Sequence, residues 1–321
     1  SYAYVSGPRM VQEYTGVPVD NQALGGVGAH AGASGVATFV ASSPDTADDI
    51  MAEVLSLLPS NADEPAPLAP TADPIDRELT GIGDVLPTTI TGSYDMRRII
   101  EAVVDDGLLT EFRAAWATNL VTALATIDGQ TVGVVANQPQ SLAGTLDIAA
   151  SQKGARFVTM CDAFNIALVT FVDPPGFQPG KDLEWRGMIR HGAQLAFAYA
   201  RATVPRICVT VRKSYGGAYI VMDSKLMGND IALAWPSAEI AVMGAKGAVE
   251  ILHRQASEDE RRALEADYEE RLLNPYVAAE RGSVDMVIEP EHTRREVVAA
   301  LRALQSKRER LPRRVHDNTP L

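Results

Sequence analysis

Cysteine and histidine are scarce in this sequence. Its 321 residues include two cysteines, Cys161 and Cys208, and five histidines. Both cysteines lie in apolar segments, which indicates buried thiols in a reducing compartment and argues against a disulfide framework. The histidines have none of the spacings that zinc ligands show, so we predict that the chain binds no metal.

Long apolar runs and an excess of positive charge are missing as well. No stretch approaches the roughly 20 apolar residues that cross a bilayer, so we predict no membrane segment. Residues 1–8 have neither the basic start nor the apolar core of a signal peptide. The formal net charge of −12 argues against a nucleic-acid partner, although a local basic mouth could still hold a small anion.

The character of the sequence changes once along the chain. Residues 60–91 are rich in proline and acidic side chains and have no periodicity, so we predict a linker there. The linker separates a short N-terminal part, residues 1–59, from a larger C-terminal part, residues 92–321.

The C-terminal part alternates between strand and helix patterns, which predicts an α/β domain with ligands bound where strands run into helix N-termini. Asp128-Gly129 between two β-branched runs predicts a hairpin. Ser257 with Glu260, and Thr293 with Glu296, fit the capping boxes of two late helices. We expect strands at 120–127, 131–136, 167–173, 206–212, 231–235 and 239–243, and helices at 45–58, 99–107, 147–165 and 187–202 and from 244 onward.

Two glycines and an alanine stand where one of these strands turns into a helix. The apolar run 206–211 precedes Gly216-Gly217-Ala218, and helical spacing resumes from Val221 to Leu226. A helix start leaves its first N–H groups without partners, and glycine lets a ligand approach them. Such amides can hold an anion, or an oxygen that becomes one during a reaction. A tight turn that needs small residues for packing explains the same letters, and the glycines alone leave both readings open.

A second turn rich in glycine and proline follows the strand predicted at 167–173. Three prolines and two glycines lie within 172–180, and the chain then enters the helix predicted at 187–202. A stiff loop of this kind suits the wall of a binding site, and it equally suits a structural Ω-loop.

Gly26-Val27-Gly28-Ala29-His30-Ala31 fits a dinucleotide-loop pattern, but it follows a polar segment instead of a strand. We therefore expect an interface loop. His30 and Ser34 lack the surroundings of a nucleophile elbow, so we expect His30 to be a hydrogen-bonded structural residue.

Several motifs of the C-terminal part belong together: NQP at 137–139, LDI at 146–148, KGARFV at 153–158, CDAFNI at 161–166, IRHGA at 189–193, RKSYGGAY at 212–219 and AWPSAEIAVMGA at 234–245. The set resembles the carboxyltransferase β-subunit of biotin-dependent acyl-CoA carboxylases, most closely the propionyl-CoA and actinobacterial acyl-CoA type. The resemblance runs over nearly the whole chain and is densest from Asn119 to Gly282.

The resemblance implies a crotonase-like fold, a spiral of ββα units. Residues 1–59 would be the C-terminal part of the family's N-domain, 60–91 the linker, and 92–321 a complete C-domain. The family's earlier glycine-rich motifs, which help to hold the acyl-CoA and supply a second oxyanion hole, are not in this sequence. The chain also has no initiator Met, so we interpret it as a fragment or a processed product.

The resemblance also implies a reaction. A carboxyl group moves from carboxybiotin to the α-carbon of a short acyl-CoA, acetyl-CoA or propionyl-CoA, and gives malonyl-CoA or methylmalonyl-CoA. The family needs no side-chain base, because biotin N1 can accept the α-proton. The amides of Gly217 and Ala218 match the family's oxyanion pair, and we assign them to the biotin side. Substrate or biotin binding would fall to Gly176, Phe177, Arg190, His191, Gly216, Tyr219 and Ile220.

Some of these positions keep a structural alternative. Apolar Ile220 would line the acyl pocket, whereas His191, beside Arg190, could equally be a packed residue behind the site. Arg212 and Lys213 could lie at the mouth of the site or simply solvate the turn. We expect Asp147 and Asp173 to be structural.

The partners follow from what the chain lacks. It contains no A-M-K-M biotinylation motif, so biotin must arrive on a partner, the biotin carboxylase and carrier α-subunit. The resemblance implies a homohexamer built from dimers, in the bacterial cytoplasm or the mitochondrial matrix. Two alternatives remain: a subunit of a biotin-dependent transcarboxylase or decarboxylase, and a non-catalytic assembly subunit.

Overall fold

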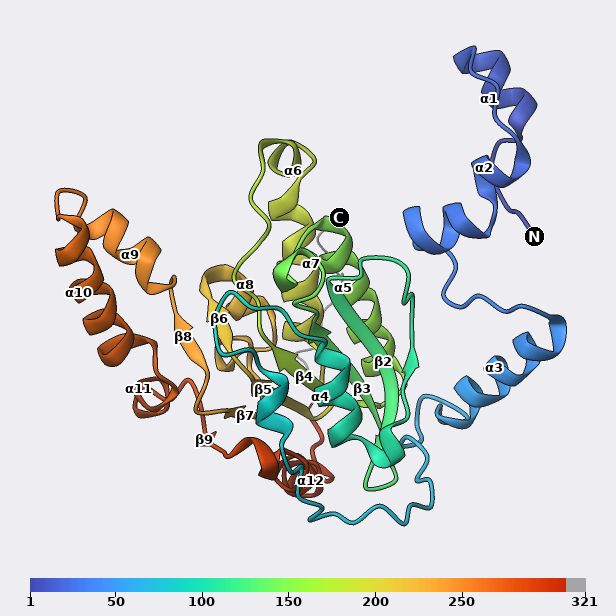
Figure 1. The fold of residues 1–321 in the computed structure, drawn as a ribbon. Helices are drawn as coiled ribbons and strands as arrows, with labels where there is room; N and C mark the ends of the chain where they lie inside the picture. Colours follow the sequence, from blue (N-terminus) through green and yellow to red (C-terminus); the bar gives the residue numbers. More distant parts are fainter. Residues whose placement is uncertain (310–321) are drawn as a thin grey trace.

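The computed structural model describes residues 1–309 of the chain, and its central feature is a mixed sheet of seven strands (Figure 1). The strands lie in the order β1-β2-β3-β4-β5-β7-β9, and β6 and β8 pair separately in a small sheet. Their bounds are β1 Thr110–Glu111, β2 Leu120–Ile127, β3 Gln130–Asn137, β4 Ala167–Val172, β5 Arg206–Thr210, β6 Lys213–Tyr215, β7 Ile231–Ala234, β8 Glu239–Ala241 and β9 Met286–Val287.

The direction of the strands determines where loops can meet. β1, β2 and β3 are antiparallel, whereas β3, β4, β5, β7 and β9 run parallel, so the parallel strands end at the same edge of the sheet. The predicted hairpin at Asp128-Gly129 is confirmed, and both of its residues have the positive φ that such a turn requires, 53° and 72°.

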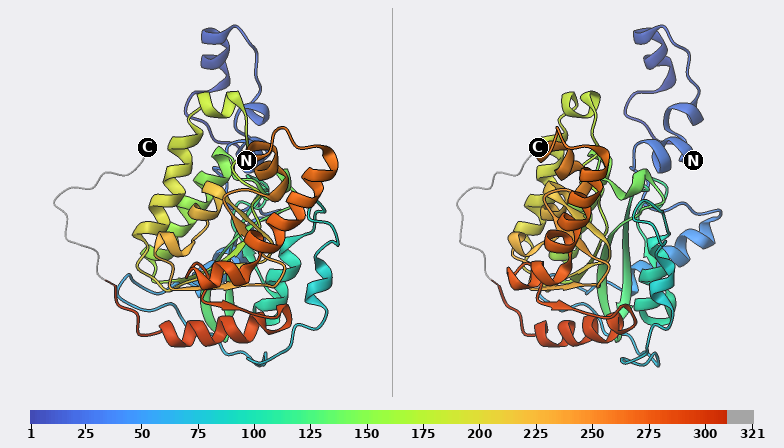
Figure 2. Two further views of the ribbon diagram at one scale, coloured as in Figure 1. Left: turned by 90° about the vertical axis from the view of Figure 1, so that its left-hand side faces the viewer. Right: turned by 60° about the vertical axis from the view of Figure 1, so that its left-hand side comes forward.

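Helices cover both faces of the sheet (Figure 2). Two of them, α4 and α12, lie on one face, and α5 and α7 lie on the other. None of the helices within residues 1–309 is long and apolar enough to cross a membrane. Their bounds are α1 Pro8–Thr15, α2 Asn21–Gly25, α3 Pro44–Ser56, α4 Met96–Val103, α5 Ile148–Ala163, α6 Lys181–Trp185, α7 Met188–Arg201, α8 Gly216–Val221, α9 Ala245–Leu252, α10 Glu258–Tyr268, α11 Pro275–Glu280 and α12 Thr293–Leu304.

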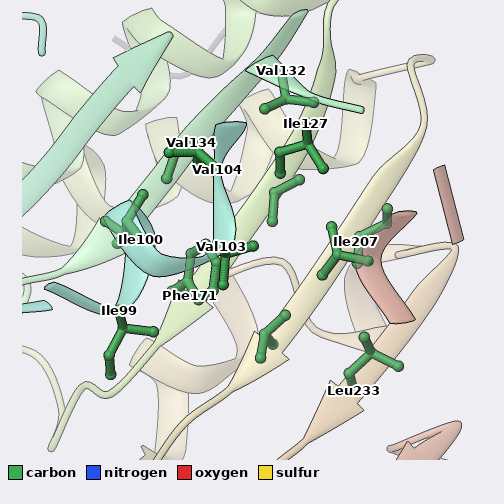
Figure 3. Packing of buried hydrophobic residues seen from close by; sticks show 14 of the residues in the cluster. Ile99, Ile100, Val103, Val104, Ile127, Val132, Val134, Phe171, Ile207 and Leu233 are labelled. Atoms are coloured by element: carbon green, nitrogen blue, oxygen red, sulfur yellow. The ribbon is translucent and has the colours of Figure 1, made fainter. Parts of the chain in front are cut away.

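Alternate residues of each strand enter two separate cores. In β4, Val169 and Phe171 point to the face covered by α4 and α12, where Figure 3 shows Phe171 near Ile100 and Val103. Leu168 belongs to the other core, under α5 and α7. This period of two in a strand buried on both faces explains the continuous apolar runs in the sequence.

The segment predicted as a linker has no α-helix and no strand, but it is anchored along the body. Leu79 and Ile82 are 4% and 5% exposed and belong to the core under α4 and α12. The N–H of Ala69 donates to the carbonyl of Gly129 at 2.7 Å. The side chains of residues 60–91 therefore contribute to folding, which their composition did not indicate.

The first residues behave differently. Among residues 1–34 only Gly25 and Gly26 are buried, and α1 and α2 stand away from the body in Figures 1 and 2. From Gly35 onward the chain returns to the body: Arg113 Nε donates to the carbonyl of Gly35 at 2.8 Å, and the rings of Phe39 and Phe112 pack edge-to-face at 4.9 Å. His30 bonds Ser34 Oγ at 2.8 Å, so its expected role as a hydrogen-bonded residue is confirmed.

One of the two predicted capping boxes is wrong. Ser257 and Glu260 form theirs at the start of α10. Thr293 lies inside α12, and its hydroxyl donates to the carbonyl of Pro290 at 2.7 Å and accepts from Trp235 Nε1 at 2.8 Å. The buried indole needs an acceptor, and it engages the hydroxyl that the motif assigned to the helix start.

Candidate functional site

The predicted turn from strand to helix is confirmed at Gly216. The short strand β6 ends at Tyr215, and α8 begins with Gly216, whose φ is +59°. A Cβ on Gly216 would lie 3.0 Å from the carbonyl oxygen of Val242, so both the backbone angle and the space require glycine. The preceding strand was not foreseen: β6 leaves the main sheet and pairs with β8.

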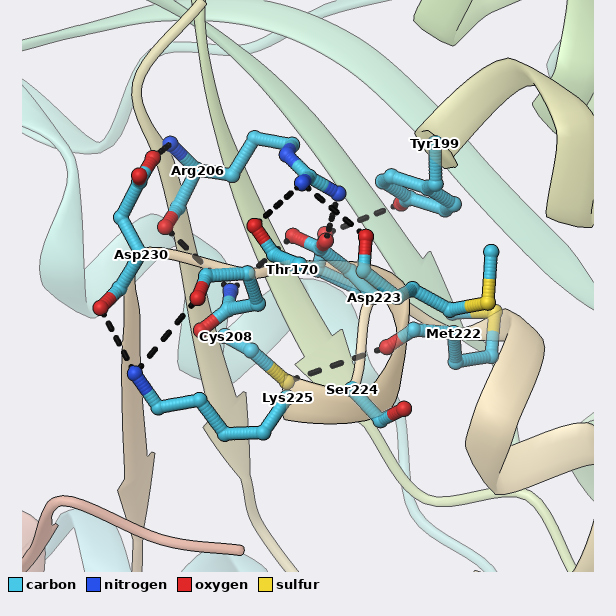
Figure 4. A network of polar contacts seen from close by, with 12 residues as sticks. Thr170, Tyr199, Arg206, Cys208, Met222, Asp223, Ser224, Lys225 and Asp230 are labelled. Carbon is cyan, nitrogen blue, oxygen red and sulfur yellow. Dashed lines mark hydrogen bonds and ion pairs between the residues drawn. The ribbon is translucent and has the colours of Figure 1, made fainter. Parts of the chain in front are cut away.

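The helix after the turn is shorter than predicted. It ends at Val221, and Asp223 has a φ of +59°, which stops the helical spacing expected as far as Leu226. Asp223 is fully buried and forms an ion pair with Arg206 at 2.8 Å (Figure 4). Burial raises its pKa to about 7. This pair ties the end of α8 to the start of β5.

The first N–H groups of α8 are available as donors. Those of Gly217 and Ala218 fall in the first turn, where a helix offers no acceptor. Neither donates a hydrogen bond to a group outside the helix in the part of the chain that the structure describes. Gly217 is exposed, whereas the Ala218 methyl group is buried in the core. The turn therefore presents the Gly217 amide at the surface, with the Ala218 amide buried directly behind it.

The second predicted loop meets this turn. Gly176 accepts the N–H of Leu146 at 3.1 Å, which places Phe177 beside α8. A Cβ on Gly217 would lie 3.5 Å from the Phe177 ring, and a Cβ on Gly192 in α7 would lie 3.2 Å from it. Phe177 thus fills the space between the two helices and forms a wall next to the amides.

Tyr219 and Ile220 leave the turn in different directions. Tyr219 packs against the small apolar cluster that contains Ile240 and Ala278, and burial raises its pKa to about 12. Ile220 is 37% exposed. The phenol of Tyr219 is therefore neutral near pH 7, and an apolar side chain stands at the surface near the amides.

Arg190 and His191 lie on the first turn of α7 but do not face Phe177. Arg190 is exposed, and His191 is half-buried and lies 3.3 Å from Gln152 of α5. The next residue, Gly192, is the one that contacts the Phe177 wall. The structure brings together Gly176, Phe177, Gly216, Gly217 and Ala218. Arg190 and His191 lie on the neighbouring surface instead.

Neither reading of Arg212 and Lys213 was right, because both side chains are buried. They lie 4% and 9% exposed around the carboxylate of Asp173, below the turn. Burial raises the pKa of Asp173, and the two cations oppose that shift. Sequence reasoning treated Asp173 as an isolated structural residue, although an acid and a basic pair at the ends of neighbouring strands were a usable signal.

A large cavity lies elsewhere. Its volume is about 730 Å³, and it is lined by residues of α5 and α7 together with Ser34 and Trp116. None of the predicted site residues lines it. Within residues 1–309, no group of three or more His, Cys, Asp or Glu side chains is placed to hold a metal ion.

Known proteins account for this arrangement. The carboxyl transferase domain matches residues 1–319 of the sequence. The chain belongs to this family. Transcarboxylase 12S, solved with methylmalonyl-coenzyme A bound, superposes on this chain with a TM-score of 0.97 and 44% identity, over 100% of this chain and 62% of that one. The α/β, crotonase-like carboxyltransferase fold predicted from the motifs is confirmed.

The relatives of this chain are subunits of different enzymes. It is 48% identical to the propionyl-CoA carboxylase beta chain of Saccharopolyspora erythraea and 47% identical to the methylmalonyl-CoA decarboxylase subunit alpha of Veillonella parvula. Both matches cover 100% of this chain but only 62% and 63% of those proteins. The chain therefore spans less than two thirds of the length of the relatives that it matches.

Proposed function

We propose that this chain forms the biotin side of a carboxyltransferase site at the start of α8. The observation that carries the proposal is a pair of N–H groups without acceptors outside the helix, that of exposed Gly217 and that of buried Ala218 next to it, in a member of the carboxyl transferase domain family. Carboxybiotin, when bound, supplies the carboxyl group that is transferred to the α-carbon of an acyl-CoA. Two fixed amides stabilise an oxygen whose negative charge grows during that transfer.

The residues around the amides fit a flat ureido group. Gly217 has no side chain, and the nearest atoms to its missing Cβ belong to the Phe177 ring, so a planar ligand can approach the N–H groups along an apolar wall. The positive φ of Gly216 turns the chain from β6 into the helix, so the next N–H groups lie in the first turn of α8. Tyr219, with its raised pKa, accepts no proton near pH 7. We therefore assign this chain to positioning and charge stabilisation, with no side-chain base.

The acyl group that we propose is short: acetyl-CoA, propionyl-CoA or both. Ile220 follows the amides by half a turn and presents an aliphatic side chain. An apolar wall suits an alkyl chain, because no buried carboxylate has to be desolvated beside it. The names of two relatives, which mention propionyl-CoA and methylmalonyl-CoA, support this substrate class.

The amides do not distinguish a carboxylase from a decarboxylase or a transcarboxylase, since all three classes occur among the relatives. We favour the carboxylase, because several of the relatives are named as subunits of propionyl-CoA or acetyl-/propionyl-CoA carboxylases. A non-catalytic assembly subunit has no need of a glycine at 217, so the exposed amide argues against it.

The partner that we propose is a biotin carboxylase and carrier subunit. The sequence has no biotinylation motif, so biotin must reach the amides from another chain. We further propose a homo-oligomer of the hexameric kind that is named for transcarboxylase 12S.

Turnover in the reverse direction tests the proposal. The protein, in its native length and oligomeric form, is incubated with malonyl-CoA or methylmalonyl-CoA and a free biotin ester. The carboxyl group passes to biotin N1, the N1 proton passes to the α-carbon, and acetyl-CoA or propionyl-CoA is measured. Turnover that requires the biotin ester is the expected result, whereas an intact oligomer without turnover points to an assembly subunit.

Gly217→Pro locates the reaction at the amides. Proline removes the N–H but breaks no other hydrogen bond, because this N–H has no acceptor outside the helix. We expect kcat to fall by roughly 100- to 1,000-fold, as it does when one oxyanion donor is lost. Gly217→Ala is the matched variant: it keeps the N–H and adds a methyl group at 3.5 Å from Phe177, an ordinary contact. Equal losses in both variants would contradict the assignment.

A further inference from the structure

A single buried carboxylate contacts both loops of the candidate site. Asp173 directly follows β4 and precedes the loop with Phe177. Its side chain is 0% exposed and accepts the backbone N–H of Lys213 at 2.8 Å and Nε of Arg212 at 3.1 Å. Lys213 opens β6, which leads into Gly217.

The Asp173 carboxylate extends the hydrogen bonding between the ends of β4 and β5 by one bond beyond the last backbone pair. The N–H of Val211 donates to the carbonyl of Val172 at 3.0 Å. The N–H of Lys213 points to the same side, since N–H groups two residues apart in a strand share a direction. There it meets the Asp173 carboxylate instead of a carbonyl. The side chain thus replaces a backbone acceptor where the two loops diverge.

Arg212 extends the contact to a third segment. Its side chain is 4% exposed, its Nη2 lies 3.0 Å from Asp173, and its Nη1 donates to the carbonyl of Gly92 at 2.9 Å. The guanidinium also lies 5.1 Å from the centre of the Tyr94 ring. The ion pair therefore holds three chain segments at the edge of the sheet where the amides are.

We propose that Asp173 and Arg212 are positioning residues that set the place of the Phe177 wall relative to the Gly217 amide. This inference rests on the proposed function and deepens it. A buried ion pair adds little stability compared with apolar side chains of the same shape, so stability alone does not explain its presence. It does fix the relative orientation of the two segments, because the Asp173 carboxylate must accept from the Arg212 guanidinium and from the Lys213 N–H at the same time.

The chain contains a matched control. Asp105 and Arg294 form an ion pair at 2.6 Å, with side chains 3% and 0% exposed. The Asp105 carboxylate also accepts a backbone N–H, that of Gly129, at 2.8 Å. This pair lies at the β2–β3 hairpin, at the opposite edge of the sheet from the end of β4.

The test compares two double variants, Asp173→Asn with Arg212→Met and Asp105→Asn with Arg294→Met. Each variant removes one negative and one positive charge, although the first also takes from Lys213 the carboxylate that lies 3.9 Å from its Nζ. We expect similar losses of Tm, but only the first variant to lose kcat in the reverse assay, by roughly tenfold or more with KM for the acyl-CoA unchanged, because small displacements of positioned groups slow chemistry. Equal loss of kcat in both variants overturns the proposal.

Amide hydrogen exchange provides a readout that needs no turnover. In the Asp173 and Arg212 double variant we expect faster exchange in peptides covering 172–180 and 211–222, and in the control variant only around 105–130. Unchanged exchange in the first two peptides overturns the positioning role. If the unaltered protein shows no biotin-dependent turnover, the proposed function fails, while the exchange measurement still decides whether this pair holds the loops.

Discussion

Lys153 places a positive charge inside the domain. Its side chain is 1% exposed, and Nζ donates to the carbonyls of Arg113, Trp116 and Leu120 at 3.0, 2.9 and 2.7 Å. Burial lowers its pKa to about 8. The ammonium holds the irregular segment before β2 against α5, and it does so without a carboxylate in hydrogen-bond contact.

The stability that Lys153 contributes depends on pH in a defined direction. Its pKa is about 8 in the folded protein and 10.5 in its ordinary state, so folding releases a proton between these values. Its contribution to the free energy of unfolding is fully present above pH 10.5 and is lost as the pH falls towards 8. We expect the free energy of unfolding of the wild type, relative to Lys153→Met, to rise from pH 8 to pH 10 by at most about 1.4 kcal/mol per pH unit. Chemical denaturation at both pH values measures it, and a difference that falls with pH would contradict it.

Ile220→Asp tests the acyl pocket. The residue follows the amides and is 37% exposed, so a carboxylate there tolerates solvation but no longer offers an apolar wall. We expect kcat/KM to shift between acetyl-, propionyl- and butyryl-CoA, with the longest chain losing most. Ile189→Asp, at an exposed position on α7, serves as the control. An unchanged acyl-CoA profile in Ile220→Asp would remove this residue from the pocket.

Single residues were predictable where one local rule decides their role. Gly216 needs a positive φ and Gly217 lies in the first turn of a helix, and both properties follow from a strand, a glycine pair and a helix in sequence. Asp173 was expected to be structural without a partner and Arg212 was misplaced, because their ion pair joins the ends of two strands far apart in the sequence, and the charges at those ends were considered separately.

Among the elements, most of those with a long periodic pattern were predicted within one or two residues, whereas α4 runs from Met96 to Val103 instead of over the expected 99–107. The hairpin strands and α5 agree with the expected ranges, since apolar alternation, Asp-Gly and a capping Asp act locally. The short elements were predicted only in part. β8 lies within the strand expected at 239–243, but its partner β6, three residues long, was not predicted, because only tertiary contacts bring the two together. The end of α8 was missed as well, because buried Asp223 takes a left-handed backbone.

Asp147→Ala tests the start of α5. The carboxylate accepts the N–H of Ala150 at 2.8 Å and a side-chain N–H of Asn119 at 3.2 Å. We expect a loss of about 1–2 kcal/mol in the free energy of unfolding, at the upper end for a helix cap because a second donor is also left without its partner. Asp147→Asn keeps an acceptor and should lose less. Equal losses, measured by denaturant unfolding, would show that the cap itself contributes nothing.

For the whole molecule, the N-terminal arm of α1 and α2 has no core of its own. Tyr14 is 93% exposed and Met10 is 63% exposed, and the two buried residues before Gly35 are glycines. Apolar surface of this kind is typical of a region that packs on another chain or domain. The domain division at 60–91 stays a prediction, although that segment is anchored to the body and the arm is not.

We therefore expect the chain to self-associate through this arm. Sedimentation should give a multiple of the single-chain mass, and Met10→Ser with Tyr14→Ser should lower it while the unfolding transition of the body is retained. Tyr276→Ser, an exposed aromatic residue on α11, is the control. A single-chain mass for the unaltered protein, or no effect of the arm variant, would rule out this role.

The order of the strands in the main sheet has a consequence for biosynthesis. Because the sheet reads β1-β2-β3-β4-β5-β7-β9, each strand that leaves the ribosome finds its partner already made and adds at the free edge. One face cannot close in this way: it waits for Val297 and Leu301 of α12, near the end of the chain. A polypeptide released before α12 is complete would carry a finished sheet whose face under α4 is only partly covered, which makes it a substrate for chaperones and proteases.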